Sequence, residues 1–183
     1  MISLRDVMPE DKDMIRNWRN LPEVRQYMYT DHIISPEEHG RWFQGIFGDP
    51  KRRFWIVQSD DKPVGLVSLH DIDEHNKRCY GAIYIAKPGE RAKGAGTFAS
   101  HSVMRYAFDE LSLNKLCCET LAFNDRVIEM YKSLGLVQEG LYRRHVRKGD
   151  QFVDVVALAI LREEWEVQKP EIEARLRTKG LIP

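Results

Sequence analysis

Six residues in the middle of the chain, Arg91-Ala92-Lys93-Gly94-Ala95-Gly96, combine two cations with two glycines. They follow a predicted strand at 80–86 and precede a predicted helix at 97–111, so they occupy the start of that helix. A helix start presents free backbone N–H groups and the positive end of the helix dipole, and small residues let an anion approach that backbone. The spacing favours an anion-binding loop, although a turn that needs glycine at positive φ would give the same pattern.

Two further side chains have the chemistry that proton transfer requires. Glu119 lies in the run LCCETLAF, where apolar neighbours would suit its carboxyl group to take up a proton. A carboxylate that faces solvent or pairs with an arginine is the alternative for this position. Tyr131 lies on the inner side of a predicted helix at 124–135, and a phenol, whose ordinary pKa is about 10, can protonate a leaving group. On its pattern alone, a tyrosine of the hydrophobic core is the better interpretation of that position.

Hydrophobic periodicity and turn residues place the elements that must position these groups. We expect a strand at 2–7, helices at 9–20, 21–29 and 35–49, strands at 54–58, 63–71 and 77–86, the helix at 97–111, a strand at 114–123 and the helix at 124–135. Two strands around a turn at 148–150 should follow. A charged tail helix at 163–177 is expected to be broken near Pro170.

The order of these elements predicts the fold class. Three successive strands with short connections indicate an antiparallel meander, whereas strand, helix and strand around the glycine loop indicate a parallel pair with a right-handed crossover. We therefore expect an α/β or α+β fold. Its central sheet should have about seven strands, mostly antiparallel, with one splayed parallel pair and flanking helices.

Composition and charge narrow the class of protein. The 28 Lys and Arg residues balance 28 Asp and Glu residues, which argues against a nucleic-acid partner, because a phosphate backbone calls for a basic surface. No apolar run approaches the ~18 residues of a membrane span, and the first residues lack the apolar core of a signal peptide. We therefore expect a cytoplasmic protein without membrane association. His70, His75 and Cys79 do not have the spacing of a common zinc site, so no metal is expected.

These motifs together resemble the GCN5-related N-acetyltransferase (GNAT) superfamily. The superfamily pattern Arg/Gln-x-x-Gly-x-Gly/Ala, between a strand and a helix, is matched at 91–96, and a second segment is matched by Asn124, Tyr131, Leu134 and Gly135. The order of strands and helices matches over residues 2–162. The resemblance implies a GNAT domain at 1–162, with 163–183 as its helical tail, and an enzyme that transfers acetyl from acetyl-CoA directly to an amine in a ternary complex.

The resemblance also assigns roles to individual residues. In the superfamily the glycine loop holds the pyrophosphate of acetyl-CoA, and pantetheine lies between the two splayed strands. The implied coenzyme contacts are Ile83, Tyr84, Ile85, the loop 91–96, Asn124 and Lys132. Glu119 would take the proton of the acceptor amine or bind that amine, and Tyr131 would protonate the departing thiolate. A backbone N–H near Ile85 would meet the oxyanion.

The N-terminal third suggests an acceptor. The segment 19–29, within the longer stretch 16–43, resembles the pseudaminic-acid branch of the superfamily, whose members acetylate the 4-amino group of UDP-4-amino-4,6-dideoxy-N-acetyl-β-L-altrosamine. A guanidinium suits a diphosphate, and apolar or aromatic side chains suit uracil or a deoxy-sugar methyl group. The expected acceptor-binding residues are Arg19, Met28, Tyr29, His39, Trp42 and Tyr84. Core packing is the alternative for Met28, Trp42 and Tyr84, and a surface position is the alternative for His39.

Other functions share these features. Acetyltransferases that act on ribosomal-protein N-termini or on diamines have a similar N-terminal segment, and a diamine would favour an acidic cleft. This segment instead supplies Arg16, Arg19 and Arg25. A non-catalytic regulatory module that binds acetyl-CoA is an alternative of another class, and the presence of both Glu119 and Tyr131 argues against it. A homodimer is compatible with the sequence.

Overall fold

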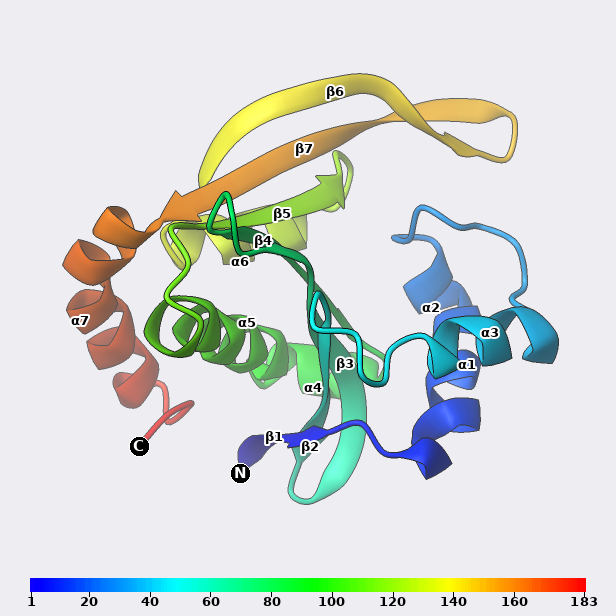
Figure 1. The fold of residues 1–183 in the computed structure, drawn as a ribbon, viewed down its shortest axis with the longest axis horizontal. Coiled ribbons are helices and arrows are strands. Elements are labelled where there is room, and N and C mark those ends of the chain that lie inside the picture. Colours follow the sequence, from blue (N-terminus) through cyan, green and yellow to red (C-terminus); the bar gives the residue numbers. More distant parts are fainter.

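Seven strands form one sheet in the order β1-β2-β3-β4-β5-β7-β6, in a computed structural model that describes residues 1–183 (Figure 1). The strands are β1 (Ile2–Asp6), β2 (Arg53–Ser59), β3 (Lys62–Asp73), β4 (Arg78–Ile85), β5 (Lys115–Leu121), β6 (Val137–Lys148) and β7 (Gln151–Leu161). Only β4 and β5 run parallel, and every other neighbouring pair is antiparallel. The predicted mixed sheet with one parallel pair is confirmed.

Helices pack on both faces of β2 and β3. On one face lie α1 (Lys12–Asn20), which follows the 3₁₀ turn η1 (Pro9–Asp11), α2 (Pro22–Arg25) and α3 (Pro36–Gln44). The main core contains buried side chains of α5 (Ala95–Arg105), its π-helical end η2 (Tyr106–Glu110), α6 (Asp125–Ser133) and α7 (Arg162–Thr178). The short helix α4 (Pro88–Ala92) has no buried residue and connects β4 to α5. Because side chains alternate along a strand, Ile56 packs with the first group while Val57 packs in the main core.

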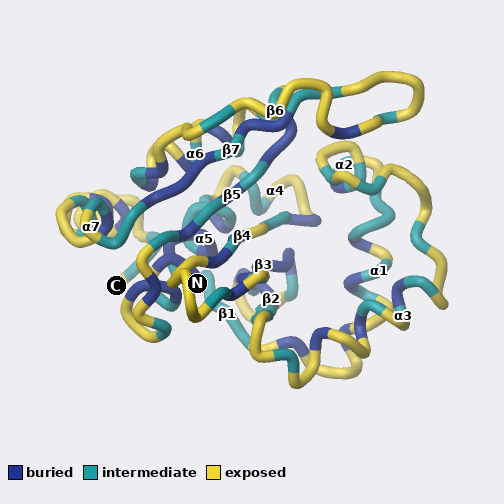
Figure 2. The backbone as a smooth tube through the Cα atoms, turned by 45° about the horizontal axis from the view of Figure 1, so that its top comes forward, coloured by how far each residue is buried: buried dark blue, intermediate teal, exposed yellow.

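The parallel pair separates along its length. Pairing runs from Arg78 opposite Lys115 to Gly81 opposite Cys118 and then stops. Beyond that point the rest of β4 pairs only with β3, and the rest of β5 pairs only with β7. The two strands therefore diverge and leave an opening at the centre of the sheet. The edge strand β6, at the opposite end of the sheet from β1, is exposed over most of its length (Figure 2).

The tail helix differs from its prediction. It runs unbroken from 162 to 178 with Pro170 inside it. Trp165, before the proline, and Ile172 and Leu176, after it, are all buried in the main core, so packing holds both halves on one axis. Pro170 itself is exposed, so its lost hydrogen bond falls on the side where water can compensate. None of the helices combines the length and apolarity that a membrane crossing requires.

The ends of other helices differ from their predicted positions by only a few residues. Helix α2 ends at 25 and α3 at 44, each about four residues before the predicted end. The short helix α4 was not predicted, and its last two residues, Arg91 and Ala92, are the first two of the glycine loop. The turn between β2 and β3 has Asp60 and Asp61 at positive φ, as the tight hairpin geometry requires.

Substituting Gly65 by alanine should destabilise the β3–β4 pair. A Cβ at this position would collide with the carbonyl oxygen of Tyr84 and lie 2.8 Å from Cδ1 of Ile85. Overpacking of this kind costs about 1–3 kcal/mol, and each kcal/mol lowers the Tm of a chain of this size by about 2–4 °C. Thermal unfolding measures the effect. Gly89→Ala, where nothing lies within 4 Å, is the matched control, and equal Tm values for the two variants would contradict the expectation.

Candidate functional site

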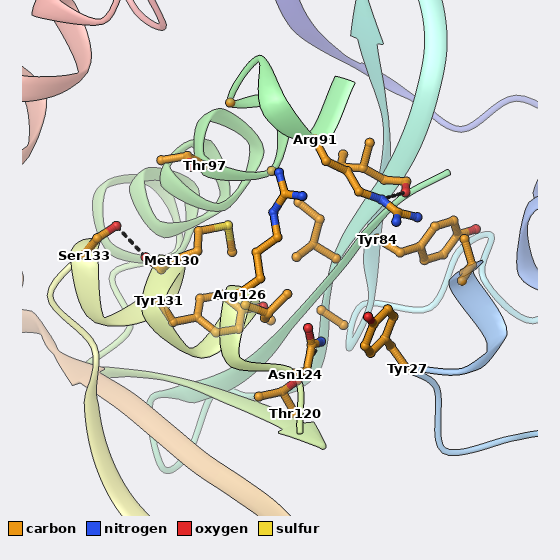
Figure 3. A pocket seen from close by; sticks show the side chains of 18 of the residues that line it. Tyr27, Tyr84, Arg91, Thr97, Thr120, Asn124, Arg126, Met130, Tyr131 and Ser133 are labelled. Atoms are coloured by element: carbon orange, nitrogen blue, oxygen red, sulfur yellow. Dashed lines mark hydrogen bonds between the residues drawn. The ribbon is translucent and has the colours of Figure 1, made fainter. Parts of the chain in front are cut away.

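The opening between β4 and β5 leads into a cavity of about 880 Å³ (Figure 3). Its walls come from parts of the chain that are far apart in sequence. The lining includes residues of α2 and the segment after it, β4, the loop before α5, the end of β5, α6, and the end of α7. The diverging strands thus place one continuous cavity beside most of the catalytic and coenzyme-binding residues that the sequence analysis singled out.

The glycine loop faces this cavity. Gly94 stands at the N-terminal end of α5 with φ of 85°, in the left-handed region that glycine adopts without strain. At Gly96 a Cβ would come within 3.3 Å of the Met130 sulfur atom, so glycine leaves room at the helix start. Ala95 is the loop residue whose side chain packs into the core instead. The helix start can therefore receive an anion on its backbone N–H groups.

Arg91 holds the loop in place. Its Nε–H donates to the carbonyl of Ile85 at 2.8 Å, and Nη2 donates to the carbonyl of Glu23 at 3.3 Å. The loop arginine therefore ties the end of β4 to α2. Lys93 pairs with Glu90 at 2.9 Å and also borders the cavity.

Lys132 is, besides Ala95, the expected coenzyme contact that the structure places away from the cavity. It pairs with Glu129 at 3.0 Å on the outer side of α6 and does not belong to the lining. The reason is helix geometry, because the residue after Tyr131 points about 100° away around the axis. Arg126, which was not singled out, lies on the cavity side of the same helix and extends toward the loop before α5 (Figure 3).

Tyr131 is both a core residue and a cavity residue. Its side chain is 5% exposed, packs in the main core and borders the cavity, so the two alternatives for this position are compatible. Burial raises the pKa of Tyr131 well above its usual value, with a smaller contribution from the Cys118 thiol beside it. The phenol is therefore a neutral hydrogen-bond donor at ordinary pH. Asn124 lies close by and donates from Nδ2 to the hydroxyl of Thr120 at 3.2 Å (Figure 3).

Glu119 and Tyr29 meet across the cavity mouth. The Tyr29 hydroxyl donates to Oε2 of Glu119 at 2.7 Å, although the two residues are 90 positions apart. Burial raises the pKa of Tyr29, and donation to the carboxylate adds to that shift. The carboxylate is half-buried and has a phenol as its neighbour, so its surroundings are more polar than the flanking sequence suggests. It is a hydrogen-bond acceptor that an amine can approach.

The segment that carries Tyr29 is held by the β6–β7 hairpin. Nζ of Lys148 donates to the carbonyls of Arg25 at 3.2 Å and Met28 at 2.7 Å. The Gly149 N–H donates to Asp31 at 2.8 Å. Sequence reasoning missed this contact, since no local pattern relates a hairpin tip to a segment about 120 residues earlier.

A second cavity of about 360 Å³ adjoins the first across β4 and the segment after α2. The two cavities share Met28, Ala82, Ile83 and Tyr84 as lining residues. Of the expected acceptor residues, Arg19, Met28, His39, Trp42 and Tyr84 line the second cavity, and Tyr29 lines the first. The structure thus brings together side chains from α1, α3 and β4 that the sequence could only group by type.

Several polar atoms of the second cavity are buried without a partner. They are Nη1 of Arg19, both ring nitrogens of His39 and the hydroxyl of Tyr84. Burial lowers the pKa values of Arg19 and His39 and raises that of Tyr84. His39 is 3% exposed, so the surface alternative for it is wrong. Buried polar groups of native proteins usually have partners, so this group of donors and acceptors is suited to a polar ligand.

Comparison with known proteins agrees with this geometry. The sequence profile of the family described as Acetyltransferase (GNAT) domain matches residues 2–137. The acetyltransferase PseH of Campylobacter jejuni is 28% identical over 72% of this chain and 82% of its own length. YdaF of Bacillus subtilis, a proposed ribosomal N-acetyltransferase, is 31% identical over 92% of this chain and 95% of its own. The spermidine N(1)-acetyltransferase of Escherichia coli is 25% identical over 90% of this chain and 88% of its own length.

A solved structure shares the fold over nearly the whole chain. The spermidine N-acetyltransferase of Vibrio cholerae, in complex with CoA and spermine, superimposes with a TM-score of 0.84 at 23% identity. The match covers 90% of this chain and 98% of the other. From the profile match, these relatives and the shared fold, we conclude that the chain belongs to the GNAT acetyltransferase family and transfers acetyl from acetyl-CoA to an amine.

Proposed function

We propose that the acceptor is the amino group of an anionic, nucleotide-linked amino sugar of the UDP-4-amino-4,6-dideoxy type. The observation that carries the proposal is the buried, unpartnered guanidinium nitrogen of Arg19 in the cavity beside the acetyl-transfer site. A buried cation favours an anionic or hydroxyl-rich ligand and disfavours a polycation. The 28% identity to PseH and the resemblance of residues 19–29 to the pseudaminic-acid branch support the same acceptor.

The side chains around the cavity supply the groups that acyl transfer needs. The backbone of the glycine loop and its own Lys93 would bind the pyrophosphate of acetyl-CoA. Glycine at 96 keeps that space open, because a Cβ there would come within 3.3 Å of the Met130 sulfur atom. The unpaired edge of β4 offers backbone groups to the pantetheine amides, and a backbone N–H near Ile85 would stabilise the oxyanion.

Two side chains would handle protons. Glu119, with Tyr29 bound to one carboxylate oxygen, would take a proton from the acceptor amine or hold that amine in place. Tyr131 would give its proton to the sulfur as the thiolate leaves, and solvent would restore it. A thioester carbonyl bound between Glu119 and Tyr131 would have the base, Glu119, and the acid, Tyr131, on different walls of one cavity.

A polyamine is the second candidate acceptor. The spermidine acetyltransferase relative supports it, and Glu23 and Glu119 line the larger cavity, where carboxylates would suit a cationic amine. A ribosomal-protein N-terminus is the third, supported by the likeness to YdaF. What separates them from the nucleotide sugar is the smaller cavity, where the buried Nη1 of Arg19 can only donate and a polyamine, itself a cationic donor, could not satisfy it.

A panel of acceptors tests the proposal. Thiol release from acetyl-CoA would be followed with a UDP-4-amino-4,6-dideoxy sugar, spermidine and a peptide with a free N-terminus. We expect kcat/KM for the nucleotide sugar to exceed the others by at least about 100-fold, as hydrogen-bond complementarity in a built site allows. Turnover with spermidine or peptide alone would overturn the acceptor proposal and leave the coenzyme site unaffected.

Replacing Arg19 by methionine should separate acceptor binding from chemistry. We expect KM for the nucleotide sugar to rise about 10- to 100-fold, the size of a charge-assisted hydrogen bond, with KM for acetyl-CoA unchanged. Folding should not suffer, because Nη1 of Arg19 has no partner within the protein. Arg41→Met, on the exposed side of α3, is the matched control. An equal rise in both KM values, or none, would contradict a role in acceptor binding.

A further inference from the structure

The larger cavity has two ends of different charge. The carboxylates of its lining, Glu23 and Glu119, come from α2 and β5. The lining residues from α6 and α7 include Arg126, Arg175 and Lys179 but no carboxylate, and Arg91 and Lys93 come from the loop before α5. Glu119 lies on β5 and the Tyr131 side chain lies beside Cys118 of the same strand, so we place the far part of the coenzyme at the cationic end that Arg126, Arg175 and Lys179 form.

Contacts fix the end of α7 against this cavity. Leu181 lies directly over the glycine loop, since a Cβ at Gly94 would come within 2.7 Å of its Cδ2 atom. A guanidinium nitrogen of Arg175 donates to the carbonyl of Ser133 at the end of α6. The last turn of α7 and the residues after it are therefore part of the cavity wall beside the start of α5.

Two of the three cations have no competing partner. Neither Arg126 nor Lys179 forms an ion pair or a side-chain hydrogen bond with the rest of the chain, whereas most lysines and arginines of the cavity do. Arg177, two residues before Lys179, contrasts with it. Its guanidinium pairs with Glu173 at 3.2 Å and donates to the carbonyl of Pro183 at 2.9 Å.

We propose that Arg126, Arg175 and Lys179 bind the 3′-phosphate on the ribose of coenzyme A and that Leu181 packs beside the nucleoside. The pyrophosphate would lie on the loop that Leu181 touches, so the next phosphate along the molecule falls at this cationic end. A phosphate dianion matches guanidinium and ammonium groups. The inference depends on coenzyme use and not on which amine is the acceptor. It assigns a binding role to the tail helix, which lies beyond the family profile.

Calorimetric binding of CoA and 3′-dephospho-CoA, without any acceptor, tests this assignment. The wild type should bind CoA about 10-fold more tightly than 3′-dephospho-CoA. Lys179→Ala should weaken CoA binding about 3- to 10-fold, a modest effect because the side chain is exposed, and leave 3′-dephospho-CoA unchanged. Arg126→Ala should act in the same way, and the double variant should bind the two ligands equally. Raising the salt concentration should reduce the preference for CoA.

Arg177→Ala is the control, because it removes a cation from the same helix turn that already has partners. It should retain the wild-type preference for CoA. Equal affinities of the wild type for the two ligands would overturn the proposal. So would a loss in Lys179→Ala that is the same for both ligands, which would indicate a structural role. Since no acceptor is present, these results are independent of the acceptor panel.

Discussion

Tyr131→Phe should lower kcat about 100- to 1,000-fold and leave the dissociation constant of CoA within about twofold of the wild-type value. The hydroxyl lies in the cavity wall, and its burial raises the pKa of Tyr131, so the proton is present at every ordinary assay pH. The phenylalanine ring would keep the core packing and remove only the proton donor. Steady-state kinetics together with calorimetric CoA binding would measure the two effects separately.

Tyr106→Phe is the control for this substitution. Tyr106 packs edge-on against Trp55 at a centroid distance of 5.1 Å and does not border the cavity, so its loss should leave kcat unchanged. Because Tyr131 remains protonated, the wild-type rate should show no loss from its ionisation below about pH 10, the ordinary phenol pKa. A Tyr131→Phe enzyme with wild-type turnover would remove the general-acid role and leave Tyr131 as a packing residue.

Glu119→Gln should lower kcat/KM for the amine about 100-fold near neutral pH without weakening CoA binding. The amide keeps the shape of the side chain but cannot accept a proton. The size of the loss should depend on pH if Glu119 acts as a base. As pH rises, more of the amine is neutral without help, so the variant should approach the wild type on the alkaline side.

A loss of the same size at every pH would mean that Glu119 positions the amine and that water removes the proton. Glu139→Gln is the matched control, because Glu139 lies on β6 and pairs with Lys115 at 2.7 Å, outside both cavities. Tyr29→Phe gives an intermediate test, since it removes the hydrogen bond to Oε2 and leaves the carboxylate in place. Its effect should be smaller than that of Glu119→Gln.

The sequence alone determined the features that depend on neighbouring residues. A glycine at positive φ before a helix, a tight turn at Asp60–Asp61 and an apolar stripe on α5 each follow from conformational preferences within a few residues. The order of these elements then restricts the sheet to a few topologies, which is why the mixed sheet and its single parallel pair could be predicted. The motif around Gly94 and Gly96 indicated an anion-binding loop for the same local reason, and the resemblance to the family pattern indicated the coenzyme.

Which distant residues share a site depends on how the helices and strands pack, and the sequence did not show it. The bond from Tyr29 to Glu119 spans 90 residues, and the contact from Lys148 to Met28 spans 120. The unbroken tail helix likewise depends on the burial of Trp165 and Ile172, which outweighs the local cost of Pro170. Such contacts form where the packing of whole elements brings side chains together, and no preference of a short segment contains that information.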